Sequence, residues 1–565
     1  MYQKISNLKE SIVLNKIIKF SNFYILCLSL IFFYVCFDSS KLSTEILDLF
    51  PKVEQRDILD IHRELEDSNQ VLIYTKDSIS PLESLPHINH ITNLKDNIYI
   101  IDIDKNIKMQ DFYENFKSFI DSTENFADLK YFSSEILMIE NSEAIFDDVN
   151  LIMISSILFL VVLYVFILRI PFLSLNTLIT IISANLLGIT MLTMFYDNVN
   201  IMSLNFGVAI GNLAIDYMLH HHFFRLYMHR FKFNKSVFYG FVTTFSGFFI
   251  CLFIPFPLLS QLSLYAMVCL LVSYLSFGFL YQEIRFKKPI FYRSMRRLRK
   301  PRVNNRYIII ASIAILAVCL PNLKLDYNLE RLDYENKERL ENRDFFIKEL
   351  GEDSTILLFA DSKENLQKNI YQIASSATLK SNPQSAKIIE KNNKFYAKLN
   401  IDSNDLESIK KLDFVDTRST KELSDEITSG IYKPMIIVLS IVIVVMIAIV
   451  FAVTRSLVSF SYTIAPLSII SLYFLNAEVN IMHLFSLLII VVSSVDYGIY
   501  VEKEGENIKT LHAIIFSSIT TIAGFGFLSF SNILALKSFG LTITIGLIVI
   551  LALLLFQKRH IKKGA

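Results

Sequence analysis

The chain has 565 residues, of which 53% are hydrophobic and only 19% are charged, and its mean hydropathy is +0.43. Soluble proteins contain nearer a quarter of charged residues, so this composition excludes a chain of three or four soluble domains. The net charge of +1 says little, because basic and acidic residues are segregated along the chain. We expect no nucleic-acid partner.

Apolar runs of membrane-spanning length are the dominant feature of the sequence. A bilayer core of about 30 Å requires about 20 apolar residues per helix. The first six runs are 20–37, 151–168, 172–195, 201–222, 236–256 and 262–282, and the second six are 307–320, 434–453, 457–475, 481–501, 511–530 and 536–556. We interpret the first run as an uncleaved anchor, because no small-residue cleavage site follows it.

The distribution of basic residues predicts the orientation of these spans. The stretch 285–306 contains ten basic residues and no acidic one, and cytoplasmic loops are enriched in Lys and Arg. The two long loops are more acidic and fall on the other side of the membrane. The predicted order is a cytoplasmic segment (1–19), TM1 (20–37), an extracytoplasmic domain (38–147), TM2–TM6 (148–282), a basic cytoplasmic linker (283–306), TM7 (307–320), a second extracytoplasmic domain (321–432), TM8–TM12 (433–556) and a cytoplasmic tail (557–565).

Short motifs recur between the two halves of the chain. Val-Asn-Ile-Met occurs at 199–202 and again at 479–482, and an Asp-Tyr pair begins 17 residues after each Val. These pairs are Asp216-Tyr217 and Asp496-Tyr497. A Thr-Thr-x-x-Gly-Phe stretch also occurs twice, beginning at Thr243 and at Thr520. Equivalent motifs in the same order indicate a duplication, and six spans per copy make the two copies parallel.

Each long loop mixes helix-like and strand-like stretches. The segments 53–67 and 334–350 are typical of helices, whereas 98–103 and 395–400 are typical of strands. The predicted fold is therefore a polytopic α-helical membrane protein with twelve transmembrane helices in two parallel six-helix repeats. Each repeat carries one small α+β extracytoplasmic domain.

The most informative residues are Asp216 and Asp496, which lie within the fourth apolar run of each half. A charged side chain near the centre of a membrane helix costs about 2.5–3.5 kcal/mol on insertion scales. This chain accepts that cost twice at matching positions, which indicates a relay for protons or another ion. The alternative is a pair of protonated acids that bind helices together, worth about 1 kcal/mol each. No Lys or Arg lies at the membrane centre, which favours a proton over a fixed salt bridge.

Several neighbouring residues complete the predicted relay. Tyr217 and Tyr497 adjoin the acids, and each hydroxyl could reach the Asp of the opposite half if the two fourth spans face each other. The possible lining residues are Asn212, Ser493, Ser494, Thr243, Thr244, Thr520 and Thr521. For the threonines, bonding back to their own helix is an equal alternative.

Motifs of enzymes and metal sites are missing from the sequence. It contains no GxxxxGK[ST], GxSxG, HExxH or CxxC motif. We therefore predict no catalytic residue, no cofactor and no metal site, with an ion gradient as the energy source. The tract 220–222 contains three consecutive histidines, but they point in different directions at a helix end, so we interpret them as interface residues.

These motifs resemble the resistance–nodulation–division (RND) superfamily, and within it the MMPL-like branch of lipid and hydrophobe exporters. The resemblance covers the whole chain and depends most on Asp216-Tyr217 and Asp496-Tyr497. It implies proton-driven export in which both Asp-Tyr pairs relay protons and porter-like external domains move the substrate. We expect an inner (plasma) membrane location, and the distribution of basic residues predicts that both termini are cytoplasmic.

The resemblance sets expectations for partners. It implies contact with membrane lipids and a lipid or other hydrophobic substrate, and a homo-oligomer is compatible with it. The external domains are too small for docking hairpins, so we expect no direct docking to an outer-membrane channel. Two alternatives stay open: an accessory factor for protein translocation, as in the Sec-accessory members of the superfamily, and a lipid sensor or scaffold without transport.

Overall fold

The structure is a computed structural model. It describes residues 21–43, 53–65, 69–77, 79, 81–104, 107–122, 129–228, 233–254, 256–281, 286–290, 303–327, 334, 336–350, 353–378, 386–402, 405–504 and 508–557. The predicted cytoplasmic segment 1–19, most of the basic linker 283–306 and the tail beyond residue 557 lie outside these ranges.

Helices of membrane-spanning character dominate the described residues. Nine helical segments within them are long and apolar enough to cross a membrane, and two further apolar helices are shorter. The nine contain α5 (Ser134–Val162), α6 (Pro171–Phe195), α10 (Pro257–Leu275), α11 (Asn305–Cys319), α15 (Thr420–Thr454), α16 (Leu457–Phe474), α17 (Ile481–Glu504), α18 (Ile508–Gly526) and α19 (Leu534–Phe556). The shorter two are α2 (Ser21–Cys36) and α9 (Lys235–Cys251). These helices make the chain a multi-pass membrane protein.

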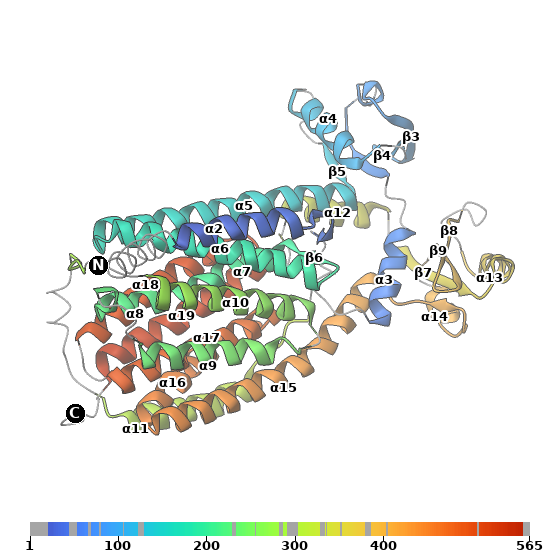
Figure 1. Ribbon diagram of the computed structural model, residues 1–565. Coiled ribbons are helices and arrows are strands. Elements are labelled where there is room, and N and C mark those ends of the chain that lie inside the picture. The colour runs from blue at the N-terminus through green and yellow to red at the C-terminus, as the bar shows by residue number, and fades with distance from the viewer. Residues whose placement is uncertain are drawn as a thin grey trace. The chain divides into compact units, whose positions relative to one another are not determined.

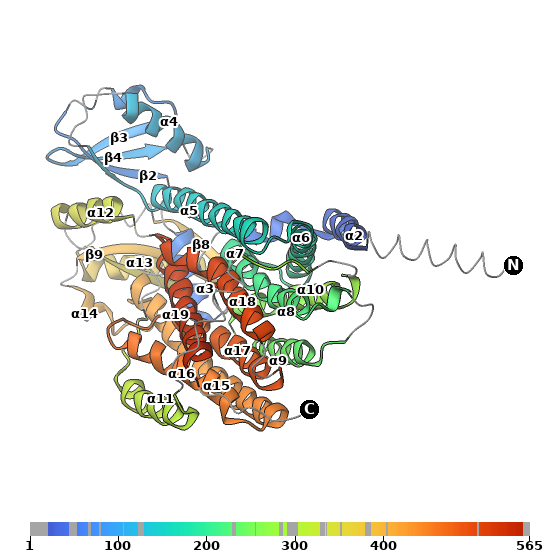
Figure 2. The same cartoon turned by 90° about the vertical axis from the view of Figure 1, so that its left-hand side faces the viewer.

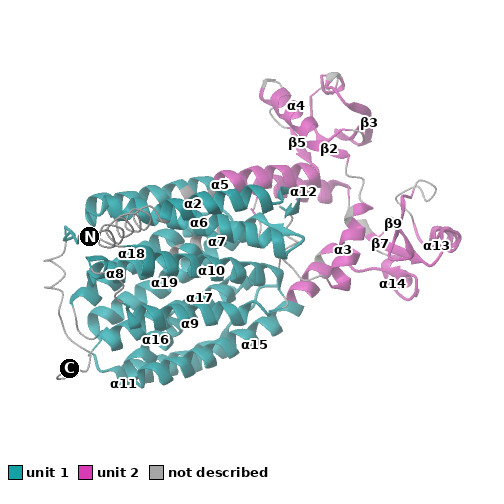
Figure 3. Ribbon diagram, viewed as in Figure 1, with its two compact units in different colours: residues 1–51, 148–327, 430–565 teal, residues 52–147, 328–429 magenta. Residues whose placement is uncertain are grey.

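The chain divides into two compact units (Figure 3). Unit 1 comprises 1–51, 148–327 and 430–565, and unit 2 comprises 52–147 and 328–429. Unit 1 therefore holds the apolar helices, and unit 2 holds most of the two long loops. Both α5 and α15 begin in unit 2 and end in unit 1, so they extend beyond the apolar runs from which the spans were predicted.

The helices of unit 1 lie side by side along a common direction (Figures 1 and 2). Each half contains a short parallel β pairing, and the two pairings occupy equivalent positions in the two halves. Strand β1 (Leu42–Ser43) pairs in parallel with β6 (Val199–Asn200), and Leu325 pairs in parallel with Val479. In both halves, the segment after the first apolar helix thus contacts the segment before the fourth.

The fourth apolar run of the first half is not one continuous helix. It consists of α7 (Ile201–Gly211), a 3₁₀ turn η5 (Asn212–Ala214) and α8 (Ile215–Phe223). The prediction of a single span over 201–222 did not include this interruption. Its physical reason lies in Gly211-Asn212, since Gly is a weak helix former and Asn competes for backbone hydrogen bonds. The equivalent residues of the continuous α17 are Val491-Val492.

Two antiparallel four-stranded sheets form the centre of unit 2. Their strand orders are β3-β4-β2-β5 and β8-β9-β7-β10. The first sheet contains β2 (Gln70–Tyr74), β3 (Ile88–Lys95), β4 (Ile98–Ile103) and β5 (Lys130–Phe132), and the second contains β7 (Asp353–Ala360), β8 (Ile388–Lys391), β9 (Lys394–Asp402) and β10 (Val415–Asp416). In chain order both sheets have the same topology, in which the first strand lies between the third and the fourth. This is the order of a split βαβ fold.

Helices cover these sheets and bury their apolar faces. They are α3 (Glu54–Glu64), α4 (Met109–Ser122), α12 (Lys337–Leu350), α13 (Lys363–Ser376) and α14 (Leu406–Ile409). In the first sheet Phe112 and Phe116 of α4 pack against Val71 and Ile73, and in the second Leu366 and Ile370 of α13 pack against Ile356. The helix-like and strand-like stretches predicted for the two loops correspond to α3, α12, β4 and β9.

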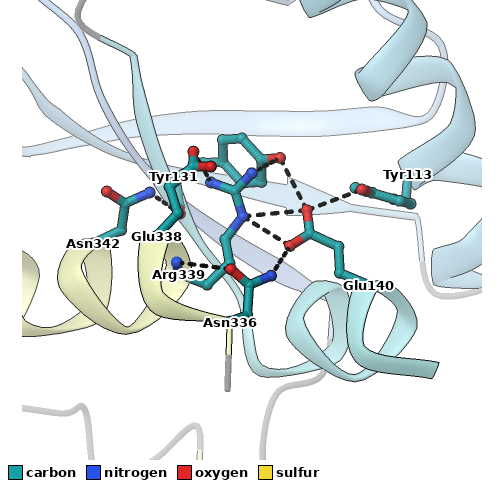
Figure 4. Close-up of polar contacts among 7 residues, drawn as sticks. All are labelled: Tyr113, Tyr131, Glu140, Asn336, Glu338, Arg339 and Asn342. Atoms are coloured by element: carbon teal, nitrogen blue, oxygen red, sulfur yellow. Dashed lines mark hydrogen bonds and ion pairs between the residues drawn. The ribbon is translucent and has the colours of Figure 1, made fainter. Parts of the chain in front are cut away.

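A buried polar cluster joins α5 to α12 within unit 2 (Figure 4). The Glu140 carboxylate accepts hydrogen bonds from Tyr113 Oη at 2.9 Å, Tyr131 Oη at 3.1 Å and Asn336 Nδ2 at 2.8 Å. Arg339 Nε lies 2.9 Å from Glu140 Oε2, and its guanidinium carbon lies 3.7 Å from the centre of the Tyr131 ring. Burial raises the pKa values of Tyr113 and Tyr131, and the nearby Glu140 carboxylate raises them further, so both phenols remain donors.

Candidate functional site

The two predicted relay acids are buried in the helices of unit 1. Asp216 lies in the first turn of α8 and is 7% exposed, and Asp496 lies in α17 and is 8% exposed. Tyr217 and Tyr497 are buried beside them. Asp216 is the second residue of α8, which follows directly on the 3₁₀ turn η5.

Asp216 contacts residues from the second half of the chain. Tyr497 Oη donates a hydrogen bond to Asp216 Oδ2 at 2.8 Å, and the same hydroxyl lies 3.1 Å from Ser517 Oγ. Ser517 and Thr521, both on α18, also lie beside the Asp216 carboxyl group. Among the described residues Asp216 Oδ1 has no hydrogen-bond partner. One carboxylate oxygen is therefore held by Tyr497, and the other is buried without a hydrogen bond to a described residue.

Asp496 contacts residues from the first half of the chain. Thr243 Oγ1 donates to Asp496 Oδ1 at 2.7 Å, and Thr244 Oγ1 donates to Asp496 Oδ2. Thr243 Oγ1 also lies 2.9 Å from the Tyr239 carbonyl oxygen and 2.8 Å from the Gly240 carbonyl oxygen. A hydroxyl has a single proton, so Thr243 can donate either to the acid or to its own helix.

The close approach of α9 and α17 explains why these threonines reach the acid. Thr243 and Thr244 share one face of α9 with Gly240 and Gly247, which lie one turn before and one turn after them. A Cβ atom on Gly240 would lie 2.6 Å from Tyr500 Oη, and one on Gly247 would lie 2.5 Å from Val492 Cγ2. Only residues without a side chain fit there, and the resulting short separation puts both hydroxyls on Asp496.

The two acids are surrounded differently, although their positions are equivalent. The predicted contact of a Tyr with the opposite Asp is present between Tyr497 and Asp216. Tyr217 instead packs its ring against Phe241, with 6.3 Å between centroids, and against Tyr274, with 6.0 Å. In the described part of the chain its hydroxyl makes no hydrogen bond to Asp496, each of whose oxygens lies within hydrogen-bond distance of one threonine hydroxyl.

The predicted lining residues separate into groups. Thr243 and Thr244 bind an acid directly, whereas Thr520 donates to the Ser517 carbonyl oxygen at 2.7 Å and Ser494 donates to the Val491 carbonyl oxygen at 2.9 Å. Ser493 Oγ and Thr521 Oγ1 are buried and make no hydrogen bond to any described residue. The side chain of Asn212 lies outside the described side chains.

Ser517 is a site residue that the sequence analysis missed. It occupies the place on α18 that Gly240 occupies on α9, three residues before the paired threonines. The spacing of residues along one helical face could have identified it. Ser517, Thr520, Thr521 and Gly524 have the same spacing as Gly240, Thr243, Thr244 and Gly247. A hydroxyl in place of a glycine hydrogen supplies the additional contact to Tyr497.

The three consecutive histidines of α8 face three different surroundings. The His220 ring lies 3.8 Å from the Tyr500 ring, His221 Nδ1 lies 2.7 Å from the Tyr217 carbonyl oxygen, and the His222 ring lies 5.1 Å from Phe286. No group of three potential metal ligands occurs among the residues that the structure describes.

Comparisons with known proteins give no sequence match. No protein-family model matches the chain, and no curated protein is significantly similar to it. Among solved structures the chain is similar to a heavy metal efflux pump, with a TM-score of 0.47 and 10% identity over 81% of this chain and 71% of that one. It is also similar to SecDF in its super-membrane-facing form, with a TM-score of 0.42 and 13% identity over 82% of this chain and 67% of that one.

Proposed function

We propose that this chain is a proton-driven secondary transporter of the RND type, with an MMPL-like substrate class. It exports lipid or another hydrophobic molecule from the inner membrane or its periplasmic leaflet. In this proposal all twelve apolar segments cross the membrane as two six-helix repeats, and both termini are cytoplasmic. The proton gradient is the energy source, and no cofactor is required.

The observation that carries the proposal is the reciprocal binding of two buried acids. Asp216 on α8 accepts a hydrogen bond from Tyr497 on α17, and Asp496 on α17 accepts hydrogen bonds from two threonines of α9. Each acid of one half is thus held by hydroxyls of the other half. Protonation removes the charge of the acceptor, and hydrogen bonds to a charged group are roughly twice as strong as neutral ones. Binding or release of a proton therefore changes the contact between the halves, as energy coupling requires.

Proton-coupled transport by the full-length protein in proteoliposomes tests this proposal. A dye inside the vesicles reports proton movement while lipid analogues are screened as substrates. We expect Asp216→Asn and Asp496→Asn each to abolish transport that depends on the pH gradient. Asp197→Asn is the matched control, because Asp197 is exposed and precedes α7, the first helix of the same apolar run.

The result for the two relay variants decides between the candidate roles. Loss of transport in both, with normal folding and a normal control, supports the two-acid relay. Transport that survives both substitutions shows that the acids are structural. In that case transport does not depend on these two acids, and the two-acid relay is wrong.

A further inference from the structure

Ionisable and hydroxyl groups continue from the acid pair to the ends of α8 and α17 that follow it. On α17, Asp496, Tyr500 and Glu504 are spaced by four residues and share one face of the helix. With a rise of 1.5 Å per residue they extend about 12 Å along the helix. On α8, His220 follows Asp216 by four residues in the same way. In the predicted orientation these helix ends are cytoplasmic.

Beyond the acids, His220 contacts both Tyr500 and Glu504. The centroids of the His220 and Tyr500 rings are 3.8 Å apart, and His220 Nδ1 lies 3.4 Å from Glu504 Oε2. The side chains of His220 and Glu504 are 0% and 6% exposed, and Tyr500 is fully buried. They therefore form one continuous buried group between the acid pair and the ends of the two helices.

Their polar atoms lack the hydrogen bonds expected of a structural cluster. Tyr500 Oη, His220 Nε2 and both Glu504 carboxylate oxygens are buried without a hydrogen-bond partner among the described residues. Most buried polar atoms in proteins are hydrogen-bonded, so each exception requires an explanation. The space for the Tyr500 hydroxyl exists because residue 240 is a glycine, where a Cβ would lie 2.6 Å from it.

The nearby cations do not neutralise Glu504 in the described contacts. Lys503 Nζ lies 5.6 Å from the centre of the Tyr239 ring, and Lys509 Nζ lies 5.9 Å from the centre of the Phe224 ring. The ionisable groups beside Glu504 in the described part of the chain are His220, at 3.4 Å, and His221. A carboxylate paired with an imidazole is a combination whose members can exchange a proton.

We infer that Glu504, His220 and Tyr500 form the cytoplasmic arm of the proton route, which connects the cytoplasm to Asp216 and Asp496. This inference rests on the proposed function. Imidazole can accept a proton on one ring nitrogen and release one from the other, and a phenol both donates and accepts. Each step moves one proton from a donor to a neighbouring acceptor. No other bond is formed or broken.

At its cytoplasmic end, the arm contains an acid from only the second half of the chain. The residues 280 positions before Tyr500 and Glu504 are His220 and Phe224, so the position equivalent to Glu504 carries no ionisable group. Glu504 thus has no acidic counterpart at the equivalent position of the first half. This asymmetry distinguishes the arm from the acid pair, which is present in both halves.

Infrared spectroscopy of the full-length protein in liposomes tests the arm without a known substrate. The carbonyl band of protonated Asp216 and Asp496, assigned with the Asp→Asn variants, shifts when the sample is transferred to D₂O. We expect Glu504→Gln and the near-isosteric Tyr500→Phe each to retain the band and to slow its shift at least tenfold. Glu504→Asp restores the rate. Glu502→Gln is the matched control, because Glu502 Oε2 accepts a hydrogen bond from Ser456 at 3.0 Å and is outside the arm.

The outcomes separate the arm from the function on which it rests. If wild-type protein shows no protonated-carboxyl band assignable to either relay acid, the proposed relay is wrong. If the band is present but exchanges at the wild-type rate in both arm variants, the relay stands and the arm is overturned. Equal slowing in Glu502→Gln would likewise overturn the arm, because any acid at this helix end would then have the effect.

Discussion

Replacing Glu140 by Gln should destabilise unit 2 strongly, because Glu140 is the common acceptor of its polar cluster. The side chains of Glu140 and Arg339 are 11% and 10% exposed, and their closest atoms are 2.9 Å apart. Removal of one partner from a buried ion pair typically costs 3–5 kcal/mol. Arg339 keeps a contact with Glu338 at 3.1 Å, but Glu338 is 74% exposed, so this contact compensates little. We therefore expect the lower end of that range, about 3 kcal/mol.

Hydrogen-exchange mass spectrometry of the full-length protein in nanodiscs measures this loss. A free-energy change of about 1.4 kcal/mol corresponds to a factor of ten, so 3 kcal/mol predicts an increase of about 150-fold in the exchange of protected amides. The informative peptides cover β5 and α12, which contain Tyr131 and Arg339.

An exposed ion pair in the same unit provides the matched control. Lys95 Nζ lies 3.2 Å from Glu349 Oε2, and the two side chains are 51% and 40% exposed. Glu349→Gln should cost less than about 1 kcal/mol, or about fivefold in exchange. In addition, Glu140→Gln combined with Arg339→Gln should recover part of the loss, because no unpaired charge stays buried. Equal small effects of Glu140→Gln and Glu349→Gln would refute the reasoning.

Three further predictions, two of them with a control substitution, test other contacts. Tyr497→Phe should lower proton-coupled transport in proteoliposomes at least tenfold by removing the donor to a relay acid, whereas Tyr217→Phe should have a smaller effect. Gly540→Ala should lower the melting temperature by an amount equivalent to about 1–3 kcal/mol, because the added Cβ would lie 2.5 Å from a backbone carbonyl oxygen. Gly278→Ala is the control: its Cβ would meet no atom within 4 Å, so the melting temperature should not change. Asp148→Asn should lower stability by about 1–3 kcal/mol in the same measurement. The reason is that the Asp148 carboxylate accepts a hydrogen bond at 3.2 Å from the backbone N–H of Asn532, which lies two residues before α19.

The sequence was sufficient to locate features that depend on single residues or on local pattern. Apolar runs predicted where the helices of unit 1 lie, because a membrane helix buries no charge without cost. The cost of burying a charge also drew attention to Asp216 and Asp496, because an acidic residue within an apolar run is easily recognised from a single sequence. The strands 98–103 and 395–400 were predicted from their apolar residues and correspond to β4 and β9.

Features that depend on which helices are neighbours could not be predicted in the same way. The contact of Thr244 with Asp496 depends on the packing of α9 against α17, which brings together residues 252 positions apart. Ser517 was missed for this reason, because its partner Tyr497 lies on another helix. The 3₁₀ turn after Gly211 was missed because a single Gly or Asn within an apolar run is usually tolerated. The order of strands in each sheet also depends on long-range pairing.

The contacts of the two acids determine which movement a proton can cause. In unit 1, α8 packs against α18, and α17 packs against α9. Both of these interfaces join the two predicted repeats, and each contains one of the acids. In the proposed relay, a proton that leaves Asp216 or reaches Asp496 therefore alters an interface between the two predicted repeats. Close-packed interfaces move between discrete arrangements, so we expect one repeat to shift against the other.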